Sequence, residues 1–156
     1  MERVLRCAAG RPLRVMRLGT GRPWAGDGWC VSASRTGGWA AGLAVRAGCC
    51  GVDIERVRPV RHAGRIAACH FHPEERRLLC RASVQGGWRL FAVLWTRREA
   101  LLKCLGTGLA VDAAGISTFA EGPFRVESHL VERADETLAL SVCLPADAPR
   151  CRLRVC

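Results

Sequence analysis

The middle of the chain contains the sequence Trp95-Thr-Arg-Arg-Glu-Ala-Leu-Leu-Lys103. Apolar residues recur at helical spacing from position 88 to position 105 without an intervening glycine or proline, which predicts one long helix over 88–105. Gly106 predicts the C-terminal end of this helix. On such a helix Trp95, Glu99 and Lys103 are successive i, i+4 neighbours. We therefore expect a helix that carries a carboxylate and an ammonium group on one face.

Lys103 is the only lysine of the chain, and arginine supplies the other strongly basic side chains. A compact, rotatable ammonium differs chemically from a planar guanidinium, so the single lysine indicates a candidate site. The alternative is an ordinary surface ion pair between Glu99 and Lys103, which would stabilise the helix by about 0.3–0.5 kcal/mol. The helix pattern by itself leaves both interpretations open.

A short segment upstream reads Gly51-Val-Asp-Ile-Glu55. As a strand it places Val52 and Ile54 on one face and Asp53 and Glu55 on the other. Two carboxylates held together repel each other unless a proton or a cation joins them. With Glu99 they form a set of three acids that suits Mg²⁺. The alternative is an exposed strand face that is simply acidic.

The remaining pattern predicts an α+β fold, because strands occur in clusters with helices between them. Gly37 and Gly38 predict the turn of a hairpin, and Pro73 marks the first turn of a helix. Gly86 and Gly87 are expected to separate that helix from the long one. The further expected strands cover 29–34, 39–45, 115–119, 124–130 and 138–144, and 151–155 is a candidate for the last strand. The further expected helix covers 61–69, while 3–18 fits either a short helix or a strand, and 19–23 is expected to turn.

Composition indicates one globular domain. The 156 residues, 17.0 kDa in mass, are 49% hydrophobic and 24% charged, and they can bury a core of their own. We see neither an apolar run of membrane-spanning length nor a secretory signal, so we expect a cytoplasmic protein. The ten cysteines form no C-x-x-C pair, which favours thiols, most of them buried, over a zinc site or a disulfide framework.

The net charge of +10 fits an acidic partner such as a phosphorylated molecule, a nucleic acid or an acidic protein. It also fits a mere bias of composition toward arginine. A metal nuclease of the D…(D/E)-x-K kind would need a lysine two residues after Glu55, where Val57 stands. No helix-turn-helix pattern or basic stripe interleaved with aromatic residues is evident. The sequence therefore disfavours a nucleic-acid protein.

Taken together, Gly51-Val-Asp-Ile-Glu55, Trp95-x-x-Arg-Glu-Ala-x-x-Lys103 and Gly106-x-Gly-Leu109 resemble the signature of the 4′-phosphopantetheinyl transferases. These enzymes move phosphopantetheine from coenzyme A to a serine of an acyl or peptidyl carrier protein. Three further segments are similar to family motifs: Gly21-Arg-Pro23, Ser32-Ala-Ser34-Arg35-Thr36 and Phe71-His-Pro-Glu-Glu75. The resemblance thus extends from about position 21 to position 109.

The resemblance implies roles for individual residues. Asp53, Glu55 and Glu99 would hold Mg²⁺ against the pyrophosphate of coenzyme A, and Lys103 would contact the phosphate that is attacked. The residues expected near the nucleotide phosphates are Arg22, Ser34 and Arg35. Glu75 would be the base for the carrier serine, or alternatively an ordinary first-turn acid of its helix.

The resemblance also implies a fold and a type. We expect a 4′-phosphopantetheinyl transferase-like fold of two pseudo-symmetric α/β halves, of the larger surfactin-synthetase-activating type. The first half, 1–50, would be shortened, and the second, 51–156, would carry the metal site. Arg35 and Arg98 replace a histidine and a lysine of the usual pattern. The implied activity is that of a holo-acyl-carrier-protein synthase; the alternative is a degenerate homologue that only binds coenzyme A or a carrier protein. The excess of arginine would suit an acidic carrier helix.

Overall fold

The computed structural model describes residues 14–17, 23–107, 113–133 and 135–150. In this part of the chain the strands form two antiparallel sheets, with strand orders β1-β2-β3-β4 and β5-β7-β6. The elements are β1 (Val15–Arg17), β2 (Pro23–Ala25), β3 (Trp29–Thr36), β4 (Trp39–Val45), β5 (Gly51–Arg56), α2 (Ala63–His70), α3 (Pro73–Arg81), α4 (Val84–Leu105), the 3-10 turn η2 (Ala113–Gly115), β6 (Phe124–Arg133) and β7 (Glu136–Pro145).

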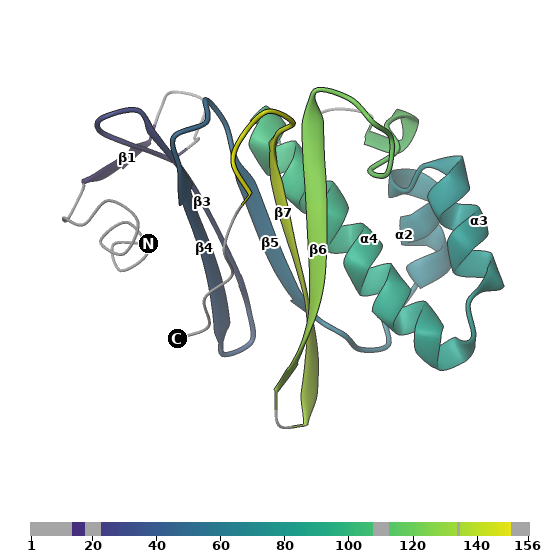
Figure 1. Ribbon diagram of the computed structural model, residues 1–156. Helices are drawn as coiled ribbons and strands as arrows, with labels where there is room; N and C mark the ends of the chain where they lie inside the picture. The colour runs from purple at the N-terminus through teal and green to yellow at the C-terminus, as the bar shows by residue number, and fades with distance from the viewer. Residues whose placement is uncertain (1–13, 18–22, 108–112, 134, 151–156) are drawn as a thin grey trace.

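The layers follow one another across the molecule. Figure 1 shows β3 and β4 beside β5, the strands β5, β7 and β6 in the centre, and α4 against the far side of this central sheet, with α2 and α3 beyond it. The mixture of helices and antiparallel strands agrees with the expected class. The division into two similar halves, at 1–50 and 51–156, stays a prediction. No helix within the described residues has both the length and the apolarity to cross a membrane.

The two faces of the central sheet have different partners. On one face, side chains of β5 and β7 pack against β4 in a core cluster that contains Leu43, Val45, Cys50, Val52, Ile54, Leu138, Leu140 and Leu144. On the other face, Cys143 packs against α4 with Ala100, Leu101 and Cys104. Because alternate residues of a strand point to opposite faces, the side chains of Asp53 and Glu55 lie on the α4 side.

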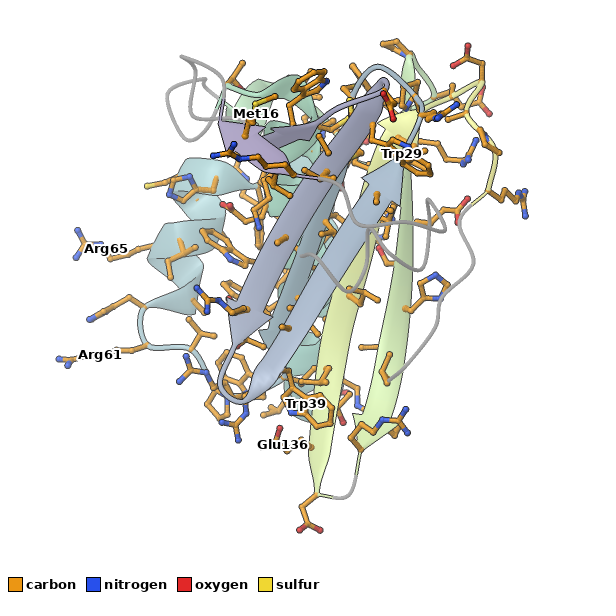
Figure 2. All side chains as sticks on the ribbon, turned by 90° about the vertical axis from the view of Figure 1, so that its left-hand side faces the viewer. Met16, Trp29, Trp39, Arg61, Arg65 and Glu136 are labelled. Atoms are coloured by element: carbon orange, nitrogen blue, oxygen red, sulfur yellow. The ribbon has the colours of Figure 1, made fainter. Side chains whose placement is uncertain are left out.

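The first sheet contains the predicted hairpin. β3 pairs with β4 from Cys30↔Val45 to Thr36↔Trp39, and Gly37 adopts a positive φ of 54° in the turn, which a glycine tolerates well. Trp39 donates from Nε1 to Glu136 Oε2 at 2.8 Å, and Figure 2 shows these two side chains close together. The hydrogen bond ties the start of β4 to the start of β7. The strands expected at 29–34 and 39–45 are confirmed.

The long helix begins earlier than expected. α4 runs from Val84 to Leu105, and the Ser83 hydroxyl caps it by accepting from the Gly86 amide at 3.2 Å. The prediction that Gly86 and Gly87 separate two helices was wrong, because the serine cap supports a first turn that contains both glycines. The predicted end is confirmed: Gly106 has a left-handed φ of 73° and closes the last turn.

The segment expected as a strand at 115–119 is a loop after η2. Side chains of the helices satisfy its backbone groups: Arg97 donates to the Thr118 carbonyl, Arg98 to the Ile116 carbonyl, and the Thr118 amide donates to Glu75. A segment whose backbone groups find such partners does not need a strand neighbour. The strands expected at 124–130 and 138–144 are present as the longer β6 and β7. The possible strand at 151–155 lies outside the described residues.

Helices α2 and α3 cover the outer side of α4. Phe71, between them, is fully buried with Phe91 and Leu94 of α4. Pro73 occupies the first turn of α3, as predicted, within a capping box formed by His72 and Glu75. α2 starts two residues after the expected position and ends at His70. Arg65 on this helix and Arg61 just before it point outward in Figure 2.

The backbone of β5 approaches the backbone of α4 closely at Gly51. A Cβ atom added at this glycine would lie 1.9 Å from the carbonyl oxygen of Ala100 and 2.8 Å from the amide nitrogen of Cys104. Both atoms belong to the helix backbone, so neither can rotate away. The missing side chain therefore sets how closely the strand approaches the helix.

We expect Gly51→Ala to lower the free energy of unfolding by about 1–3 kcal/mol or more, because the strand and the helix must separate to admit a methyl group. Urea unfolding followed by circular dichroism measures this change. Gly87→Ala on α4 is the matched control, since an added Cβ there meets no atom within 4 Å and alanine favours a helix. A Gly51→Ala protein as stable as the wild type would contradict the close contact.

Candidate active site

Asp53 and Lys103 form the centre of the candidate site. Lys103 Nζ lies 2.6 Å from Asp53 Oδ1 and also donates to the backbone carbonyl of Val52 at 3.1 Å. Asp53 is buried at 4% exposure, whereas the Lys103 side chain is 31% exposed. The ammonium group thus joins a buried carboxylate to the surface, where it can also reach a bound anion.

A row of hydroxyl groups on β3 covers the free edge of β5. Ser32 Oγ accepts from the Val52 amide at 3.0 Å, Ser34 Oγ donates to Asp53 Oδ1 at 2.6 Å, and Thr36 Oγ1 donates to Glu55 Oε2 at 2.9 Å. The three residues alternate along one strand, so their side chains share a face. The motif resemblance gave no role to Ser32 or Thr36. Their period-two spacing was the signal available in the sequence.

Glu99 belongs to the same electrostatic neighbourhood. Burial raises the pKa of the Glu99 carboxyl above its ordinary value, and the negative charges of Asp53 and Glu55 raise it further. Lys103 and His70 oppose this shift. The charges of Asp53 and Glu55 therefore reach Glu99 electrostatically. The alternative of a Glu99–Lys103 ion pair is not what forms, because the ion-pair partner of Lys103 among the described residues is Asp53.

The carboxylate oxygens at Asp53 meet some of the requirements of a Mg²⁺ site. Asp53 Oδ2 is buried and accepts no hydrogen bond from the described residues; such an oxygen favours a cation because an unsatisfied buried carboxylate oxygen is costly. Yet no three His, Cys, Asp or Glu side chains in the described ranges are grouped so that they alone could hold a metal ion. Mg²⁺ commonly uses one or two carboxylates together with water and substrate phosphates. Asp53, with water and substrate phosphates as the further ligands, fits that requirement.

His70 and Trp95 form one side of the site. Their rings meet edge to face, with centroids 5.8 Å apart, and both are partly buried. His70 ends α2, while Trp95 lies one turn before Glu99 on α4. The edge-to-face contact therefore holds the end of α2 against the turn of α4 that precedes the Glu99 carboxylate. Sequence reasoning named Trp95 in its motif but missed His70, because only the fold brings the end of α2 to this face of α4.

Glu75 lies elsewhere, in a buried network of its own. It is 0% exposed and accepts from the His72 amide, the Thr118 amide, the Thr118 hydroxyl and the Arg98 guanidinium. A carboxylate with four donors and no exposed surface is poorly placed to take a proton from a serine of another protein. The arrangement matches the alternative role, a first-turn acid of α3, and we do not assign Glu75 as the base.

The arginines of α4 support this network. Arg98, which replaces the lysine of the usual motif, is 1% exposed and turns away from Asp53 to pair with Glu75. Burial lowers the pKa of the neighbouring Arg97, and the charge of Glu75 opposes that change. Arg97 donates to Thr118, to the Val126 carbonyl and to Ser128. Both guanidinium groups thus fix the 116–118 loop and β6 against the helix.

The residues expected near the nucleotide phosphates are only partly placed. Ser34 contacts Asp53 directly. Arg35 is exposed and, by strand alternation, points away from the face that carries Ser34 and Thr36. Arg22 and most of the expected 19–23 turn lie outside the described residues. The structure therefore joins Ser34 and Lys103 to Asp53 by direct contacts, with Glu99 within the electrostatic influence of Asp53 and Glu55, and it leaves Arg35 outside this group.

Comparison with models of known protein families identifies a family for this chain. A family model described as the 4′-phosphopantetheinyl transferase superfamily matches residues 49–144. These residues include β5, α4, β6 and almost all of β7, and hence Asp53, Glu55, Glu99 and Lys103. No curated protein matches the chain.

The raised pKa of Glu99 predicts a pH-dependent difference between the wild type and Glu99→Gln. In the folded state the carboxyl holds its proton above its ordinary value of 4.5, so its stabilising contribution is complete below that pH and is lost as pH rises through the raised pKa. The stability of the wild type relative to Glu99→Gln should therefore fall as pH rises above 4.5. Urea unfolding at several pH values measures this trend.

Glu121→Gln, at an exposed position, is the control and should show no such trend. A wild type that gains stability over Glu99→Gln with rising pH would contradict the described surroundings of Glu99.

Proposed function

Since this chain belongs to the 4′-phosphopantetheinyl transferase superfamily, we propose that it transfers 4′-phosphopantetheine from coenzyme A to a serine of an acyl or peptidyl carrier protein. The reaction would depend on Mg²⁺ and release 3′,5′-ADP, which is the activity of a holo-acyl-carrier-protein synthase of the larger, surfactin-synthetase-activating type. The family match supports phosphopantetheinyl transfer in general. The proposal that the reaction depends on Mg²⁺ is supported by the residues of the candidate site.

One observation carries the proposal: the only lysine of the chain pairs with a buried aspartate that keeps one oxygen without a hydrogen-bond partner among the described residues. Phosphoryl transfer needs little covalent help from a protein and depends on positioning and charge neutralisation. An ammonium group beside an oxygen that can bind a cation provides both for a pyrophosphate. An ordinary surface ion pair would have no buried partner.

Each residue has a defined task in this proposal. Asp53, together with Glu55 or Glu99, would hold Mg²⁺, which would neutralise charge on the pyrophosphate when bound. Lys103, held by Asp53 and the Val52 carbonyl, would donate to the phosphate that is attacked. The serine oxygen of the carrier forms a bond to that phosphorus, and the bond from phosphorus to the bridging oxygen breaks, leaving 3′,5′-ADP. The serine proton passes to bulk water as that bond forms.

The buried network has a supporting task. By fixing α3 and the 116–118 loop to α4, the pair of Glu75 and Arg98 holds the helix that carries Glu99 and Lys103. Breaking such a buried pair costs about 3–5 kcal/mol. Loss of either residue would therefore act through stability and through the position of α4.

We expect the purified protein, given coenzyme A and Mg²⁺, to add one phosphopantetheine arm to at least one member of a panel of apo carrier proteins. Mass spectrometry of the carrier detects the added arm. Asp53→Ala and Lys103→Ala should each reduce the initial rate at least about 100-fold, because removing a preorganised charge of this kind costs about 2.7–4 kcal/mol.

Glu132→Gln, an exposed change on β6 whose partners Arg89 and Thr137 are not residues of the candidate site, is the matched control and should retain the wild-type rate. Full activity in both site variants would defeat the mechanism. No modification of any carrier, with coenzyme A still bound, would favour a homologue that binds without turnover.

A further inference from the structure

Among the described residues, each of the two carboxylates on β5 is held through a single oxygen. Asp53 Oδ1 accepts from Ser34 Oγ and from Lys103 Nζ, both at 2.6 Å. Glu55 Oε2 accepts from Thr36 Oγ1 at 2.9 Å. The second oxygen of Asp53 is buried and has no hydrogen-bond partner in the described part of the chain. Within the described residues, one side of the Asp53 carboxylate is therefore fixed by hydrogen bonds, and the other side has no partner.

Neutral hydroxyl groups suit this task for a physical reason. A hydroxyl orients a carboxylate oxygen by donating one hydrogen bond, and it brings no positive charge that would compete with a cation. A threonine in a strand is especially stiff, because its branched side chain restricts χ1. Ser34 and Thr36 thus have the chemistry of groups that orient metal ligands.

Ser32 shows what the same row does where no carboxylate is involved. Its hydroxyl accepts from the Val52 amide, which belongs to the edge of β5 that β7 does not cover. The row therefore has two kinds of contact. At Ser32 it satisfies the backbone of an edge strand, and at Ser34 and Thr36 it binds the side chains that face α4.

We propose that Ser34 and Thr36 are positioning residues that orient Asp53 and Glu55 for a divalent cation, so that Asp53 Oδ2 faces the ion. The motif resemblance assigned Ser34 to the nucleotide phosphates and gave Thr36 no role. The inference rests on the proposed function for the identity of the substrate, while the cation affinity can be measured without any substrate. Groups that orient metal ligands typically contribute 10- to 100-fold to metal affinity.

The test is a titration of the full-length protein with Mn²⁺ alone, read by electron paramagnetic resonance of the free ion. Ser34→Ala and Thr36→Val should each weaken Mn²⁺ binding about 10-fold or more. Thr36→Ser keeps the hydroxyl and should bind Mn²⁺ within about 2-fold of the wild type. Ser32→Ala is the matched control: it should lower the free energy of unfolding but leave the Mn²⁺ affinity unchanged. If Thr36→Val does not fold, Ser34→Ala decides the outcome.

A purely structural role for the hydroxyl row predicts a different pattern. Ser34→Ala and Thr36→Val would then be less stable, like Ser32→Ala, and would bind Mn²⁺ as the wild type does, which overturns the inference. A wild type without measurable Mn²⁺ binding also overturns it. The carrier assay separates this failure from that of the proposed function. If the wild type modifies carriers and the variants keep the metal affinity of the wild type, only the positioning role is contradicted. In that assay the variants should raise the Mg²⁺ concentration for half-maximal rate more than they lower the rate at saturating Mg²⁺.

Discussion

The approach of β5 to α4 at Gly51 is the constraint on which the rest of the structure depends. The backbone of the helix occupies the space of a side chain at this glycine. Two residues farther along the strand, Asp53 then comes within 2.6 Å of Lys103. If β5 and α4 were farther apart, the Asp53 carboxylate would be buried without the Lys103 ammonium. A buried unpaired charge destabilises the fold far more than the loss of a packing contact does. The glycine and the ion pair therefore require each other.

The close contact between β5 and α4 also explains why polar groups can be buried between these two elements. β5 is an edge strand of its sheet, so its outward backbone groups need partners other than another strand. The Ser32 hydroxyl accepts from the Val52 amide, and Lys103 donates to the Val52 carbonyl. Side chains that satisfy the edge thus also border the acids. The atoms that stabilise the edge of β5 therefore lie next to the atoms of the candidate site.

The local parts of this arrangement could be predicted from the sequence. Period-two and helical spacing predicted the strand with Asp53 and the helix with Lys103, because these patterns depend on neighbours along the chain. The 115–119 segment was mistaken for a strand, since its backbone partners come from distant side chains. The burial of Glu75 was equally invisible, because a first-turn acid has the same pattern whether or not an arginine such as Arg98 covers it. Contacts between residues that are far apart in the sequence can be identified only once the fold is known.

The central claim is that one cation and a phosphate meet between β5 and α4. A crystal structure of the protein with Mg²⁺ and coenzyme A tests it most directly. The account predicts a single ion about 2.1 Å from Asp53 Oδ2, with pyrophosphate oxygens in its shell and Lys103 Nζ within hydrogen-bond distance of a phosphate oxygen. A metal ion and coenzyme A bound elsewhere, with both Asp53 oxygens turned to protein donors, would contradict the account.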